Sequence, residues 1–131
     1  MKLKLGNLNV TVSAAGEGMQ PWGGPRPAIV HKYRVTVSGG GGRYTTSAWG
    51  SISDFGKGER DYKGIGAMVV DELLSAAADP REFAEMVIGE TEGKEATKRR
   101  AIAKRTCVAA GKFSYDDLER AVNAARDKNL L

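Results

Sequence analysis

Apolar and polar residues alternate in the stretch 30–51, and this pattern predicts a β-hairpin. Every second residue from Tyr33 to Val37 is apolar, which is the period of a strand with one buried face. Four glycines follow Ser38, as expected of a tight turn that needs positive φ angles. The stretch 43–49 is rich in Tyr, Thr and Trp, residues that favour a returning strand.

A further strand is predicted over residues 1–15. Its apolar positions change phase at Gly6 and Asn7, so we expect a bulge or a tight turn there. Residues 16–27 hold three of the chain's four prolines together with four glycines, which predicts a loop. Trp22 lies inside this loop and either folds back on the core as a lid or is exposed to a partner.

The second half of the chain has the 3.6-residue periodicity of amphipathic helices. After a polar connector at 51–66, the most apolar helix is predicted over 65–78. Asp79 is a good N-cap for a helix that begins at Pro80 and ends at Gly89. Residues 92–110 form the longest predicted helix, and Ser114 is the predicted N-cap of the last one.

These elements predict an α+β fold, in which a small antiparallel sheet of about three strands packs against about four C-terminal α-helices. At 131 residues the chain is expected to form a single domain, mainly β and loops over 1–62 and mainly helical over 63–131. No apolar run approaches the roughly 20 residues that span a bilayer, and the N-terminus lacks a signal-peptide pattern. We therefore expect a cytoplasmic protein with no membrane partner.

The sequence carries no pattern of residues typical of a catalytic or cofactor site. His31 is the only histidine and Cys107 the only cysteine, so neither a zinc site of familiar type nor a nucleophile–histidine pair is available. The Gly-x-Gly patterns at 56–58 and 64–66 do not extend to a phosphate-binding motif. We expect no enzyme activity, no cofactor, no metal and no small-molecule substrate.

Charge is distributed unevenly along the helical half. Residues 71–95 contain eight acids (71, 72, 79, 82, 85, 90, 92 and 95) and two bases (81 and 94), whereas 98–112 contains six bases (98, 99, 100, 104, 105 and 112) and no acid. In one interpretation the acidic and basic helices lie side by side and form ion pairs, each adding at most about 1 kcal/mol. In the other, one of these faces is an interface.

Three sets of candidate binding residues follow from the second interpretation. The basic face of the 92–110 helix comprises Lys94, Lys98, Arg100, Lys104 and Arg105. The acidic segment comprises Asp79, Glu82, Glu85, Glu90 and Glu92. The aromatic candidates for stacking are Trp22 and Trp49.

The hairpin residues Tyr33-Arg34-Val35-Thr36-Val37, the glycine turn, Arg43-Tyr44-Thr45-Thr46 and Trp49-Gly50-Ser51 resemble a group of small phage and prophage proteins. Phe83 in the helical tail extends the likeness, which covers residues 33–90. The Gly-Tyr-Asp usual after that helix is replaced here by Gly89-Glu90-Thr91-Glu92. Proteins of this size and origin include anti-CRISPR inhibitors, which block a host nucleic-acid-handling complex by binding it.

The resemblance implies a small phage or mobile-element protein that acts in the host cytoplasm. Its expected partner is a host defence complex of the CRISPR-Cas kind, bound stoichiometrically. The first alternative is a nucleic-acid-binding protein that uses the basic face of the 92–110 helix. The second alternative is a phage structural or accessory protein that associates with itself.

Overall fold

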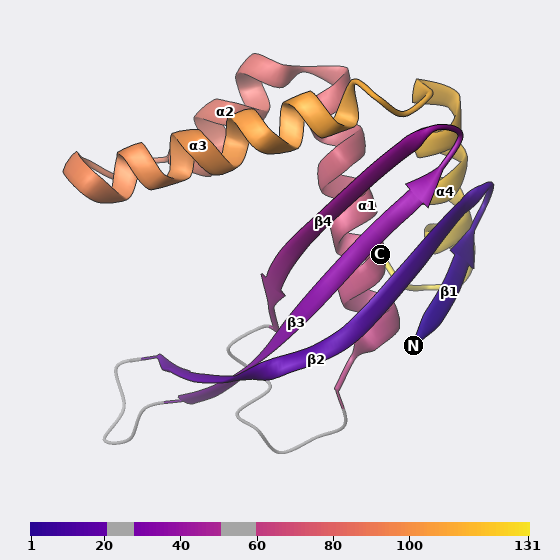
Figure 1. Ribbon diagram of the computed structural model, residues 1–131, viewed down its shortest axis with the longest axis horizontal. Helices are drawn as coiled ribbons and strands as arrows, with labels where there is room; N and C mark the ends of the chain where they lie inside the picture. Colours follow the sequence, from indigo (N-terminus) through magenta and orange to yellow (C-terminus); the bar gives the residue numbers. More distant parts are fainter. Residues whose placement is uncertain (21–27, 51–59) are drawn as a thin grey trace.

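The computed structural model describes residues 1–20, 28–50 and 60–131, which form an antiparallel sheet packed against helices (Figure 1). The strands are β1 (Lys2–Leu5), β2 (Leu8–Gln20), β3 (Ala28–Gly39) and β4 (Gly42–Trp49). The helices are α1 (Tyr62–Ala78), α2 (Pro80–Ile88), α3 (Gly93–Ala110) and α4 (Tyr115–Asp127). This confirms the predicted α+β fold, with four strands in the described residues where about three were expected.

The extra strand arises at the point where the apolar phase changes. Leu5 pairs with Leu8, so Gly6 and Asn7 form a two-residue turn between two antiparallel strands. Gly6 has φ +58°, a conformation that glycine adopts at little cost and that suits the first position of a tight hairpin turn. The change of apolar phase therefore marks a hairpin turn, and residues 1–15 belong to two strands.

Strand β2 also extends further than the sequence indicated. Residues 17–20 were predicted as loop, but they pair with Ala28–His31 of β3 after a register shift between Ala14 and Glu17. The reason is that all three prolines of this region lie after Gln20, so nothing in 16–20 prevents a strand from donating its N–H groups. Trp22 lies outside the described residues.

The β3–β4 hairpin agrees closely with the prediction. Gly39 pairs with Gly42, and the turn between them consists of Gly40 and Gly41. These two glycines have φ +58° and +87°, and two consecutive positive φ angles are what the turn best suited to the twist of a hairpin requires.

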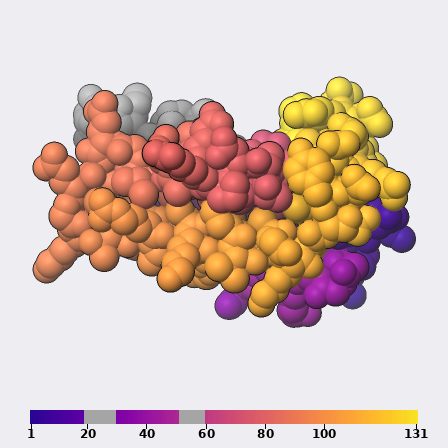
Figure 2. Space-filling view, turned by 90° about the horizontal axis from the view of Figure 1, so that it is seen from above, coloured from indigo at the N-terminus to yellow at the C-terminus, as the bar shows by residue number. Residues whose placement is uncertain are grey.

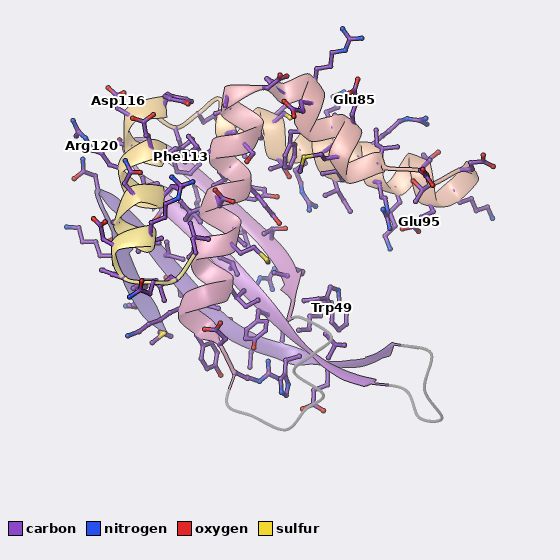
Figure 3. All side chains as sticks on the ribbon, turned by 180° about the vertical axis from the view of Figure 1, so that it is seen from behind. Trp49, Glu85, Glu95, Phe113, Asp116 and Arg120 are labelled. Carbon is purple, nitrogen blue, oxygen red and sulfur yellow. The ribbon has the colours of Figure 1, made fainter. Side chains whose placement is uncertain are left out.

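All four strands form one sheet in the order β1-β2-β3-β4, and the described helices lie on one side of it (Figures 1 and 3). Helix α1 crosses the sheet centrally, because its apolar stripe packs on the inward residues of the strands. A Cβ at Gly66 would come 3.0 Å from Val10 Cγ1, so this glycine lets α1 approach β2 closely. The largest fully buried side chains include Leu5, Leu8, Val10, Val12, Tyr33, Val35, Val37, Val69, Val70, Leu73 and Leu118.

The caps predicted for α2 and α4 are present, and α1 has an N-cap that was not predicted. Asp61 accepts a hydrogen bond from the Gly64 N–H at 2.9 Å, so α1 begins at Tyr62, three residues earlier than predicted. Asp79 accepts from the Glu82 N–H at 3.0 Å, and Gly89 closes α2 with φ +55°. Ser114 caps α4. These caps satisfy donors at the helix ends that lack a partner within the helix.

A buried hydroxyl pair links β4 to α3 and yields a stability prediction. Thr106 donates its one hydrogen to the Ile102 carbonyl at 2.9 Å, so the Tyr44 hydroxyl donates to Thr106 Oγ1 at 2.8 Å. Thr106→Val leaves the buried Tyr44 donor without its acceptor and should lower the free energy of unfolding by about 1–3 kcal/mol. Tyr44→Phe leaves Thr106 bonded to Ile102 and should cost less. Chemical denaturation of the double variant should show a loss of unfolding free energy clearly smaller than the sum of the two single losses. Additive losses would contradict the hydrogen bond assigned between Tyr44 and Thr106.

Candidate functional site

The sheet face opposite the helices is built of polar side chains arranged in rows. The pairing register places these residues next to one another across the strands, although they are distant in sequence. We call this surface the outer sheet face. Its rows are Lys4-Asn9-Ser38-Arg43, Lys2-Thr11-Thr36-Thr45, Ser13-Arg34-Ser47 and Lys32-Trp49.

The outer sheet face carries positive charge and no negative charge. Five of its side chains are cations, and none is an aspartate or glutamate. Lys2, Lys4, Arg34 and Arg43 are exposed, and none of the five forms an ion pair with a residue in the described part of the chain. Cations two residues apart on one strand stand about 7 Å apart along it. The face therefore presents unpaired positive charge on β1, β3 and β4, with the polar, uncharged residues of β2 between them.

Trp49 supplies an aromatic surface at one end of this face. Its side chain is 43% exposed, and the Lys32 ammonium lies 5.6 Å from the ring centroid. The ring reaches across β3 to Gly18 on β2, where a Cβ would stand 2.7 Å from ring carbons. Gly18 is thus required for Trp49 to lie flat across the strands, beside a lysine and open to solvent.

The remaining outer residues are small and polar, so no large side chain stands between the cations. Thr36 and Thr45 share a hydrogen bond at 3.0 Å between their hydroxyls. A shallow hollow of about 450 Å³ lies over β1 and β2. Lys2, Lys4, Asn9 and Thr11 contribute to its lining, so two cations border a space that an anionic group could enter.

Helix α3 presents the five basic residues predicted from the sequence. Lys94, Lys98, Arg100, Lys104 and Arg105 are all exposed, and α3 lies uncovered beside α2 in the space-filling view (Figure 2). Arg99, which lies between them in sequence, turns inward instead: it pairs with Glu95 at 3.1 Å and donates to the Val87 carbonyl. The structure thus assembles a second basic surface, with Glu92 and Glu95 at its start.

The residues of the acidic segment make different kinds of contact and do not act as one surface. Asp79 caps α2, Glu85 pairs with Arg81 within the same helix at 3.5 Å, and Glu92 stands at the N-cap of α3. Glu82 and Glu90 are exposed. Among the described residues no ion pair joins α2 to α3, so the proposed bridging of an acidic helix by a basic one is not seen.

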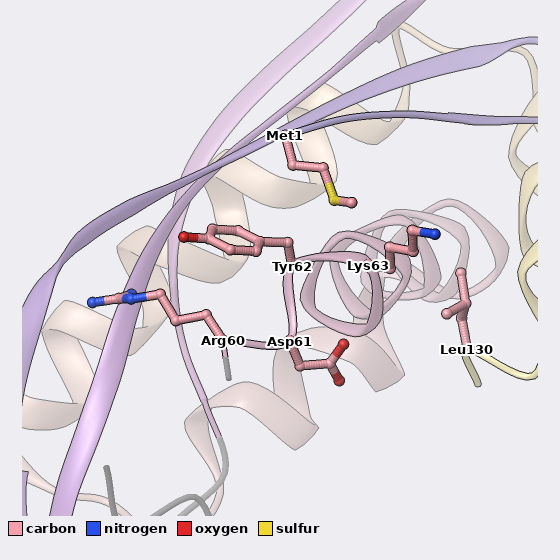
Figure 4. Close-up of a pocket in the computed structure, with 6 residues that line it drawn as sticks. All are labelled: Met1, Arg60, Asp61, Tyr62, Lys63 and Leu130. Carbon is pink, nitrogen blue, oxygen red and sulfur yellow. The ribbon is translucent and has the colours of Figure 1, made fainter. Parts of the chain in front are cut away.

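A pocket of about 620 Å³ lies beside the N-terminus of α1 (Figure 4). Two of its three charged side chains already have partners within the fold: Asp61 caps α1, and Arg60 donates to the carbonyls of Lys32 and Gly16. Met1 and Leu130 supply apolar walls. With its best polar groups engaged, this pocket has little left to recognise a ligand.

The residues most often found in catalytic and metal sites do not converge in the described ranges. His31 is buried on β3, with Nδ1 3.5 Å from Glu17 Oε1. Cys107 lies half-buried on α3, and burial raises the pKa of its thiol. No cluster of three or more metal-ligating side chains occurs over 1–20, 28–50 and 60–131. Within the same residues, no helix combines the length and apolar character needed to cross a bilayer.

Comparisons with known protein families, with curated proteins and with solved structures found no match to this chain. Sequence reasoning had identified the basic face of α3 but had missed the outer sheet face. The only signal for the latter was the polar phase of each strand.

Proposed function

We propose that this chain binds single-stranded nucleic acid on the outer sheet face. In this proposal the five cations contact phosphates, and an unpaired base stacks on Trp49. The observation that supports it is the set of register rows that place Lys2, Lys4, Lys32, Arg34 and Arg43 on one face of the sheet, with Trp49 at the end of that face and no acidic side chain in the rows.

The chemistry of the face fits a polyanion better than a protein surface of mixed charge. Lys and Arg that contact phosphates release condensed counterions, and this drives binding without regard to sequence. Arg34 and Arg43 add planar guanidinium groups that bind phosphate oxygens in pairs. Thr and Ser hydroxyls between the cations are donors for sugar and phosphate oxygens.

The lack of a described helix on this face favours a single strand over a duplex. The described helices lie on the other side of the sheet (Figure 1), so no helix on this face can enter a major groove. A single strand can instead lie across an open sheet, with a base stacked on an aromatic ring, a contact worth about 1–3 kcal/mol per base.

The basic face of α3 is the rival location for the same activity. It has five exposed cations, but its first turn contains Glu95, and Glu90 and Glu92 precede it. The described part of α3 offers no exposed aromatic side chain for stacking. We therefore assign nucleic-acid binding to the outer sheet face and treat α3 as the control surface.

Inhibition of a host defence complex, in the cytoplasm of a bacterial host, stays a prediction from the sequence resemblance. It is compatible with a nucleic-acid-binding face, because the complexes concerned handle nucleic acid. No described feature selects such a complex over other partners, and the geometry does not favour it as a second function.

Titration of a fluorescein-labelled oligothymidine, followed by anisotropy at several salt concentrations, tests the proposal. Each phosphate contact to a single strand contributes roughly −0.7 to the slope of the logarithm of the association constant against log[salt]. If all five cations contact phosphates, the slope should therefore be about −3.5. A duplex of the same length serves as the control and should bind more weakly. Absence of binding at low salt would overturn the proposal.

A further inference from the structure

A groove on the helix side of the sheet runs along the open edge of β4. Strand β4 pairs with β3 on one side, and no described strand pairs with its other side. Alternate residues of an edge strand direct N–H and C=O groups outward, where another strand can bind them. The groove, of about 430 Å³, lies against residues 46–49 of β4 and against α1, α2 and α3.

The helix walls of this groove are mostly apolar. Met68 of α1, Met86 and Val87 of α2 and Ile102 of α3 line it, and the Met86 side chain is 70% exposed. Trp49 lies at the end of β4 and is 43% exposed. It faces α2 and α3 across the groove (Figure 3). Methionine-rich walls adapt well to the side chains of a bound peptide.

One charged group faces this apolar space without a partner among the residues that the structure describes. Glu72 of α1 lines the groove, and no hydrogen bond or ion pair joins it to any described residue. Burial, and secondarily the neighbouring Asp71 carboxylate, raise the pKa of Glu72. A half-buried carboxylate with no counter-charge is unfavourable in the free protein, and a cation brought by a ligand would relieve that cost.

From the free edge, the apolar walls and the unpaired Glu72, we propose that this groove binds an extended basic segment of a partner protein as an added strand on β4. The segment carries a lysine or arginine flanked two residues away on each side by apolar residues. Backbone groups of the segment pair with β4, and its alternate side chains point toward the helices. The central cation then meets Glu72, and the apolar side chains contact the methionines.

The inference goes beyond nucleic-acid binding, because its main contacts lie along the edge of β4 and on the helix side of the sheet, and because it concerns a different class of partner. Trp49 borders both surfaces, so the two proposals are tested at different residues: Arg34 and Arg43 for the first, and Glu72 for the second. Failure of one does not affect the other. The occupant is assigned to a partner protein because Glu72 requires a counter-charge that no described residue supplies. A second copy of this chain at the β4 edge is treated as an outcome of the test.

The test uses the full chain and a capped heptapeptide of alternating threonine and valine with a central arginine. Isothermal titration compares it with peptides whose central residue is glutamine or glutamate. We expect the arginine peptide to bind roughly tenfold or more tightly than either. Glu72→Gln should remove this preference, while Glu119→Gln on the exposed surface of α4 should preserve it.

Backbone pairing is tested with the same arginine peptide carrying N-methyl groups. Methylation of one set of alternate amides should abolish binding, and methylation of the other set should leave it nearly unchanged. Equal binding of the arginine and glutamate peptides, or an unchanged preference in Glu72→Gln, would overturn the proposal. So would a dimer in light scattering that Ser47→Pro dissociates, because the edge would then belong to a second copy.

Discussion

Reversal of two arginines on the outer sheet face is expected to weaken oligonucleotide binding by roughly a hundredfold or more. Arg34→Glu/Arg43→Glu removes two phosphate contacts and places two anions in a field that contains none. Both side chains are exposed and form no ion pair with described residues, so the substitutions should leave the fold intact. Anisotropy titrations at one fixed salt concentration measure the loss.

The matched control is Lys98→Glu/Arg105→Glu on α3. It changes the net charge of the chain by the same amount and also alters two exposed cations. We expect this variant to stay within about threefold of the parent chain, because only the long-range field changes. Comparable losses in both variants would mean that net charge alone governs binding, and a loss confined to the α3 variant would move the site to that helix.

Truncation of Leu73 to alanine is expected to destabilise the fold strongly. Leu73 is fully buried on α1, the helix that lies centrally on the sheet. Leu73→Ala removes this apolar surface and leaves a cavity, which together lower the free energy of unfolding by about 2–5 kcal/mol. Urea denaturation followed by circular dichroism gives the value.

Leu74→Ala is the control for the Leu73 prediction, because it makes the same chemical change one residue further along the same helix. The two variants share the same small gain in helix propensity, so the difference between them reports packing. Leu74 is only partly buried at the edge of the core, and we expect its loss to be less than half that of Leu73→Ala. Equal losses would contradict the central position assigned to Leu73.

The elements of the fold could be predicted in detail because each depends on local chemistry. Asp79 followed by Pro80 determines where α2 begins, and Gly40 with Gly41 determines the β3–β4 turn. The errors occurred where two local signals compete. Residues 1–15 were predicted as one strand with either a bulge or a tight turn at Gly6-Asn7, because a phase change in the apolar pattern is common to both. The structure has the turn, which divides the stretch into two strands.

The candidate site was harder to predict because it depends on register. The alternation in 32–36 indicates that Lys32 and Arg34 face away from the core. It does not indicate that Lys2 of β1 shares a row with Thr45 of β4, since that depends on the register of three separate strand pairings. The basic face of α3 was found from sequence because helical periodicity alone determines which of its residues lie together.

Amide chemical-shift mapping by NMR tests the central claim most directly. Oligothymidine is added to the 15N-labelled chain at low salt, and the perturbed residues are placed on the structure. Our account predicts that perturbations concentrate on the outward residues of β1–β4, with the Trp49 indole among the largest. Perturbations concentrated on 94–105 of α3, with the strands unaffected, would contradict it.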